Sequence, residues 1–170
     1  MTKYNKDSEY LLIINDVIEN EKFKQIGNIK HHNTTRLDHS LKVSYYSYRI
    51  AKRLKLDYKD VAIGGLLHDF YDKEISDYKK ITDKVKLFTI GHPQEAIINA
   101  KEIYSLSPKE EDIIRTHMFP IDYKLPKYAE SWVVSFVDKG LSLNEFFNKF
   151  KYKFIYISNM YLLFILNTLK

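Results

Sequence analysis

Residues 61–70 read VAIGGLLHDF, an apolar run that ends in a histidine and an aspartate. The Gly64-Gly65 pair costs about 1 kcal/mol of helix propensity per residue, so we expect it to serve close backbone packing. His68 and Asp69 then stand together at the end of a buried helix, where unpaired polar groups cost several kcal/mol. Taken alone, the pair is read most simply as a helix terminus. A metal ion would also satisfy both side chains.

Helical periodicity extends outward from this stretch in both directions. Val43, Tyr46, Ile50 and Leu54 recur in steps of three and four, which predicts one apolar stripe on a helix. Capping residues and prolines then delimit the predicted helices. These cover about 8–20, 35–54, 57–69, 93–104, 108–117 and 127–138, with a loop at 27–34 and a last apolar helix at about 152–169. We therefore predict an all-α fold in one domain spanning residues 1–170.

The composition restricts the chemistry of any site. The chain has 170 residues with 45% hydrophobic and 29% charged, as in an ordinary globular domain. It contains no cysteine, so disulfides, thiolate ligands and cysteine nucleophiles are excluded, and imidazole and carboxylate must hold any metal. The polar start, Met1 to Asp7, is unlike a signal peptide and favours a cytoplasmic location.

Charge and the apolar C-terminal stretch bear on partners. The net charge of +5 comes from lysines spread along the chain, so we expect no nucleic-acid binding, although a mild positive field favours an anionic substrate. Residues 154–169 are shorter than the ~20 residues of a transmembrane span. They predict a final core helix or a dimer helix, and the dimer helix would make a homodimer. Because Lys151 and Lys153 precede them, a membrane-surface helix is the alternative.

Further metal-competent side chains occur at predicted helix ends. His39 begins the helix that carries Val43, Tyr46 and Ile50, and is predicted to point with them into the core. Asp138 is predicted near a helix C-terminus, where the macrodipole disfavours a carboxylate and a cation would offset the penalty. Each alone is a core histidine or a solvent-facing acid. The full candidate set has four imidazoles and two carboxylates: His39, His68, Asp69, His92, His117 and Asp138.

The order His39, His68-Asp69, Asp138 resembles the HD-domain superfamily of metal-dependent phosphohydrolases. The segments that carry the resemblance are 34–41 (TTRLDHSL), 65–70 (GLLHDF), 91–93 (GHP), 113–120 (IIRTHMFP) and 137–139 (VDK). They cover roughly residues 31–145, and the added histidines resemble members with two metals. In two respects the chain departs from the pattern. Asp72 replaces a lysine often found there, and the glycine-tyrosine-proline signature of cyclic-di-GMP phosphodiesterases is absent.

The resemblance implies an HD-type helical bundle with a metal site in its centre. Imidazole and carboxylate ligands suit one or two divalent transition-metal ions, with Fe or Mn first and Ni, Co or Zn as alternatives. Two ions can clamp a phosphoester, and Asp69 is the natural bridge between them. The predicted function is hydrolysis of a nucleotide or similar small phosphoester or anhydride by a metal-bound hydroxide.

Four further residues complete the predicted site. Arg36, one helical turn before His39, is a candidate for binding a substrate phosphate, with a surface salt bridge as the alternative. His31 or His32 is a candidate proton donor to the leaving oxygen. Lys139 is a candidate for neutralising phosphate charge, unless it extends into solvent. Two other functions stay open: an HD-type di-iron oxygenase and a non-catalytic, metal-stabilised binding module.

Overall fold

The chain folds into a helical bundle with one long projecting helix. The structure is a computed structural model that describes residues 3–31, 34–71 and 91–168. Its elements are η1 (Lys3–Lys6), α1 (Ser8–Ile18), α2 (Glu21–Lys24), η2 (Gln25–Asn28), β1 (Lys30–His31), β2 (Thr34–Thr35), α3 (Arg36–Arg53), α4 (Tyr58–Leu67), α6 (His92–Ile103), α7 (Pro108–Thr116) and α8 (Ala129–Thr168). The predicted all-α fold is confirmed. Among the described residues the only sheet is the antiparallel pair β1 and β2.

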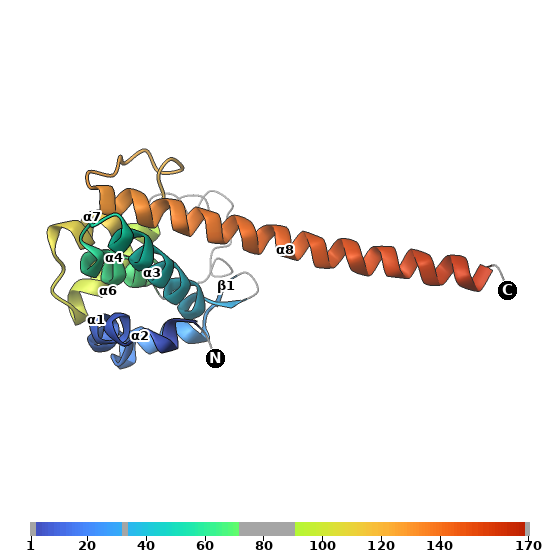
Figure 1. The fold of residues 1–170 in the computed structure, drawn as a ribbon, viewed down its shortest axis with the longest axis horizontal. Coiled ribbons are helices and arrows are strands. Elements are labelled where there is room, and N and C mark those ends of the chain that lie inside the picture. Colours follow the sequence, from blue (N-terminus) through green and yellow to red (C-terminus); the bar gives the residue numbers. More distant parts are fainter. Residues whose placement is uncertain (1–2, 32–33, 72–90, 169–170) are drawn as a thin grey trace.

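Helix α4, which ends in the histidine-aspartate pair, lies at the centre of the bundle. It packs against α3, α7, α8 and α1, and α6 packs against both α4 and α7 (Figure 1). All of its residues from Val61 to Leu67 are buried. A helix that is apolar on every side requires such a position, because it has no face to offer to water.

The two glycines of α4 allow its neighbours to approach closely. A Cβ atom on Gly65 would lie 3.1 Å from the Cα of Ser44 on α3, and one on Gly64 would lie 2.9 Å from Ile113 on α7. Both distances are shorter than ordinary van der Waals contact. The close packing expected from the glycine pair is therefore present, and it draws α3 and α7 toward the end of α4.

The predicted apolar stripe on α3 is wrong over most of its length. Tyr46, Ile50 and Leu54 are 40%, 39% and 60% exposed, and of that stripe only Val43 is buried. The buried face is lined by small residues and by the first-turn polar residues instead: Arg36, His39, Ser40, Val43, Ser44, Ser47 and Ala51, together with Tyr45 and Tyr48. Small side chains are needed there because α3 lies so close to α4. His39 is buried as expected, but on this other face.

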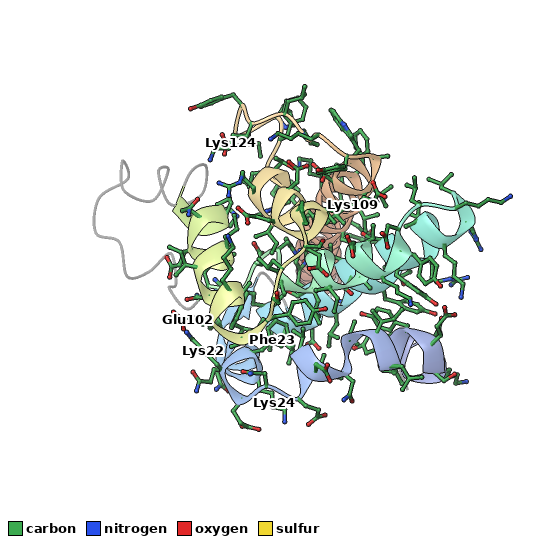
Figure 2. The ribbon with its side chains drawn as sticks, turned by 90° about the vertical axis from the view of Figure 1, so that its left-hand side faces the viewer. Lys22, Phe23, Lys24, Glu102, Lys109 and Lys124 are labelled. Atoms are coloured by element: carbon green, nitrogen blue, oxygen red, sulfur yellow. The ribbon has the colours of Figure 1, made fainter. Side chains whose placement is uncertain are left out.

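Contacts from the N-terminal helices and α6 support the chain around Phe70, next to the histidine-aspartate pair. The rings of Phe23 and Phe70 meet edge to face with centroids 5.2 Å apart, and the Asn99 side chain donates to the Phe70 carbonyl at 3.0 Å. At the surface, Lys22 of α2 forms an ion pair with Glu102 of α6, and Figure 2 shows these two side chains together. Phe70 is thereby held by elements on two sides.

Helix α8 replaces the two helices predicted for the C-terminal region. It is continuous over 40 residues and extends well beyond the bundle (Figure 1). No proline follows Pro126, so nothing in the backbone forces a break. Phe136, expected on the buried side, is 65% exposed, whereas Val134 is buried. The macrodipole argument for Asp138 is also wrong, because this residue lies in the first third of α8.

Candidate metal centre

Five helices bring six metal-competent side chains together in the centre of the bundle. Each of the six is at most 8% exposed. They come from the first turns of α3, from the ends of α4 and α7, from the start of α6 and from α8: His39, His68 and Asp69, His117, His92, and Asp138. The structure thus brings together all of the residues that the sequence singled out as candidate ligands.

The backbone fixes the orientation of His68 and His117. His68 Nδ1 lies 2.7 Å from the Gly65 carbonyl oxygen, and His117 Nδ1 lies 2.7 Å from the Ile114 carbonyl oxygen. A carbonyl can only accept, so Nδ1 carries the proton in each ring and the Nε2 lone pair points away from the backbone. Within the described part of the chain, the buried Nε2 of His68 has no hydrogen-bond partner. A metal ion would satisfy it.

Asp69 contacts histidines on both sides of the centre. Its Oδ1 lies 3.5 Å from His92 Nε2 and 3.6 Å from His117 Nε2, whereas its Oδ2 lies 3.7 Å from His68 Nε2. Two buried groups of potential ligands result, one formed by His39, His68 and Asp69 and the other by Asp69, His92 and His117. Asp69 is the member that both groups share.

The spacing of the donor atoms fits a transition-metal ion. Two ligand atoms bonded to one ion at about 2.0–2.2 Å lie roughly 3–3.5 Å apart. His92 Nε2 and His117 Nε2 are 2.9 Å apart, and His39 Nε2 is 3.0 Å from Asp138 Oδ1. Four imidazoles with carboxylates and no sulfur match iron, manganese, cobalt, nickel or zinc better than magnesium or calcium.

Burial and neighbouring charges shift the pKa values of three side chains in the site. Burial opposes charging His39, but bonds to Asp138 and Glu145 outweigh it and raise its pKa to about 10. For Asp138 burial is likewise outweighed, and contacts with His39 and His68 hold its pKa well below the usual range. Burial, with the neighbouring His68 and His92, lowers the pKa of His117 to about 3. His117 is therefore neutral at physiological pH, which suits a metal ligand, whereas His39 would release a proton on binding a metal ion.

Glu145 is a site residue that the sequence analysis missed. It lies on α8 seven residues after Asp138, and its side chain is only 11% exposed. Its Oε1 lies 3.7 Å from His39 Nδ1 and 3.6 Å from Lys42 Nζ. The available signal was the interval of seven residues, because two helical turns place both carboxylates on one face of α8.

The predicted substrate contacts lie beside the centre and bond to backbone carbonyls. Arg36 is buried, stacks on the Tyr71 ring at 3.6 Å and donates to the Tyr71 carbonyl. Tyr71 in turn lies 5.2 Å from His92, between ring centroids. Lys139 donates to the His117 carbonyl oxygen at 2.6 Å. Arg36 therefore lies in the interior rather than at the surface.

The two predicted proton donors are only partly described. The backbone of His31 belongs to β1, but its side chain lies outside the description, and His32 lies wholly outside the described residues. Asp72, the departure from the expected lysine, also lies outside them.

A comparison with known protein families shows the family to which this chain belongs. The family model for the HD domain matches residues 36–140, which include all six candidate ligands. The chain is a member of the HD-domain family. Members of this family are typically metal-dependent phosphohydrolases, and the buried histidine and aspartate clusters agree with the metal site of an HD domain. Comparisons with curated proteins and with solved structures gave no match to this chain.

Proposed function

We propose that this HD-domain protein hydrolyses a phosphate ester or anhydride in a nucleotide or similar small molecule, using two transition-metal ions. The observation that carries the proposal is the position of Asp69, whose two carboxylate oxygens face different histidines in the two ligand groups. A carboxylate shared in this way is what a two-metal centre requires of its bridging ligand.

The chain's own residues would prepare the centre for this reaction. His68 and His117 present Nε2 lone pairs because backbone carbonyls fix their tautomers. His39 and Asp138 complete one side, and His92 completes the other. Bound ions supply a nucleophile from water at neutral pH and offset the charge of a phosphoryl group. Fe or Mn is the proposed metal.

Arg36 and Lys139 stay predicted phosphate contacts, and His31 and His32 stay predicted proton donors. The cations of Arg36 and Lys139 bond to the Tyr71 and His117 carbonyls, so an incoming phosphate would compete with those bonds. The charges of Arg36 and Lys139 support their role as phosphate contacts, because cations beside the metal site favour an anionic substrate.

An anaerobic assay tests the proposed chemistry. Protein loaded with Mn²⁺ is incubated without oxygen with p-nitrophenyl phosphate, nucleoside mono-, di- and triphosphates, and dinucleoside polyphosphates, and released phosphate or nucleotide is measured. We expect turnover of at least one compound. Turnover only with iron and oxygen, without phosphoester cleavage, would replace the hydrolase with a di-iron oxygenase. Tight nucleotide binding without any product would favour a binding module.

We propose that the protein forms a homodimer in which a second copy of the chain binds along α8. Phe136, Leu143 and Phe147 are 65%, 56% and 60% exposed on the described part of this helix. The spacing of 143 and 147 continues in the sequence as apolar residues at 150, 154, 157, 161 and 164. Alternating steps of four and three over several turns are typical of coiled-coil seams.

The oligomeric state tests this partner. We expect a dimer in sedimentation velocity experiments, and a monomer when Leu143 and Phe147 are both replaced by Glu. Among the described residues no helix is long and apolar enough to cross a membrane. A wild-type monomer that binds anionic lipid vesicles would instead favour the membrane-surface alternative.

A further inference from the structure

The ring of His39 lies between two carboxylates of α8. Asp138 Oδ1 is 3.0 Å from Nε2, and Glu145 Oε1 is 3.7 Å from Nδ1 on the other side of the ring. The ring itself is fully buried, so its neighbours rather than water set its orientation and tautomer. Asp138 belongs to the candidate metal set, but Glu145 has no part in the function proposed so far.

His39 differs from His68 and His117 in its place on a helix. Those two residues follow the last turns of α4 and α7, where backbone carbonyls have no partner within the helix and can accept the Nδ1 proton. His39 lies at the start of α3, where the carbonyls accept from backbone N–H groups four residues further on. A side chain must therefore accept the Nδ1 proton of His39, as backbone carbonyls do for His68 and His117.

Glu145 is a carboxylate that lies within ion-pair distance of His39 Nδ1, at 3.7 Å. Its carboxylate is nearly buried, and Lys42, one turn after His39 on α3, lies 3.6 Å from the same Oε1 that approaches the ring. Lys42 thus holds the carboxylate over the Nδ1 edge. Carboxylates in this position fix the ring and increase the basicity of a metal-ligating imidazole.

We propose that Glu145 is a positioning residue of the metal centre, which accepts the Nδ1 proton of His39 so that Nε2 faces the metal beside Asp138. The inference rests on the proposed metal-dependent function. It extends the functional part of the chain along α8 to residue 145, beyond the segment that matches the family model. In this arrangement α8 supplies two carboxylates that contact His39, those of Asp138 and Glu145.

Titration of metal-free protein with Mn²⁺ tests the role of Glu145. The variants are Glu145→Gln, which keeps the size and a weaker acceptor, and Glu145→Leu, which removes the acceptor. We expect the dissociation constant to rise about 10-fold in the first variant and up to about 100-fold in the second. Glu102→Gln, at an exposed ion pair with Lys22, is the matched control and should bind like the wild type.

A second readout separates positioning from a general loss of stability. The metal-free Gln variant should still unfold cooperatively, and the increase in its melting temperature on adding Mn²⁺ should be smaller than in the wild type. Equal Mn²⁺ affinity in the wild type and both variants would overturn the role of Glu145 and leave the metal centre intact. If the wild type itself binds no transition metal, the proposed function fails together with this inference. The titration of the wild type therefore distinguishes the two failures: if it binds Mn²⁺, only the role of Glu145 is in question.

Discussion

His68 and His117 occupy equivalent positions at the ends of two different helices. Each is the C-cap residue of its helix, and each ring contacts the carbonyl three residues back at 2.7 Å. Their ring centroids are 5.0 Å apart. The last carbonyls of a helix need donor partners in any fold, and the Nδ1–H groups of these two candidate ligands supply them for α4 and α7. At these two positions a candidate metal ligand also caps a helix.

Replacing Asp69 by Ala should remove metal binding from both sides of the centre. Asp69 is shared by the two ligand groups, and its loss leaves Asp138, beside His39 and His68, as the remaining carboxylate of the candidate ligand set. We expect loss of bound metal in elemental analysis and loss of turnover. Asp38→Asn, at an exposed carboxylate on the same bundle, is the control and should keep both. Retention of metal and activity in the Ala variant would show that Asp69 is not a metal ligand and is only an acidic residue at the end of a helix.

Replacing His117 by Gln should remove one metal ion and leave the other. His117 belongs only to the ligand group with His92, whereas His39 belongs only to the group with His68. The reciprocal variant His39→Gln should therefore also fall from two ions per chain toward one. Metal content of the purified variants measures this directly. A wild-type content of one ion that His117→Gln does not change would exclude His92 and His117 as ligands.

Local signals in the sequence were sufficient to place four of the candidate ligands at helix ends: His68, Asp69, His92 and His117. The apolar run before His68, Pro93 after His92 and the Ser107-Pro108 start of α7 all placed a side chain at a helix end. The structure brings those ends together, and the Ser107 capping box is present. Local signals sufficed for these four because helix termini hold them, whereas Asp138 lies inside α8.

Features set by packing between helices were not predictable in the same way. Ser40, Ser44 and Ser47 line the buried face of α3, although periodicity pointed to Tyr46 and Ile50. That choice depends on how closely α4 approaches. Glu145 was missed for a related reason, since its function follows from the passage of α8 over His39 in a helix that was expected to end near Asp138.

Substituting Gly65 by Ala should destabilise the fold through overpacking. The new Cβ would lie 3.1 Å from the backbone Cα of Ser44, which cannot move without shifting α3. We expect a loss of about 1–2 kcal/mol in urea unfolding, after the gain in helix propensity is counted. Gly140→Ala is the matched control, because its Cβ would meet no atom of the described residues within 4 Å. It should be stabilising by about 0.5–1 kcal/mol. Equal effects at both glycines would contradict the close approach of α3 and α4.

Glu110 should make the protein less stable as the pH rises from 5 to 8. Burial raises the pKa of this carboxyl from 4.5 to about 7, against the donation from the Ser107 N–H and with the help of the neighbouring charge of Asp60. Between those values the folded protein holds a proton that the unfolded chain has lost. Its contribution to stability is therefore fully present below pH 4.5, declines as the pH rises toward 7 and is lost above 7.

Glu110→Gln isolates this contribution because the amide oxygen can still accept from Ser107, which bonds to Glu110 Oε2 at 2.7 Å. Urea unfolding of metal-free protein at pH 5 and pH 8 should show about 1–2 kcal/mol less loss in the variant than in the wild type. Glu111→Gln is the control on the same turn. Bonding to Lys101 lowers the pKa of Glu111, so its contribution changes only in more acidic solution. Its slope between pH 5 and 8 should match the wild type. An unchanged slope in the Glu110 variant would mean that this carboxyl is ionised throughout the range and that burial does not control its charge.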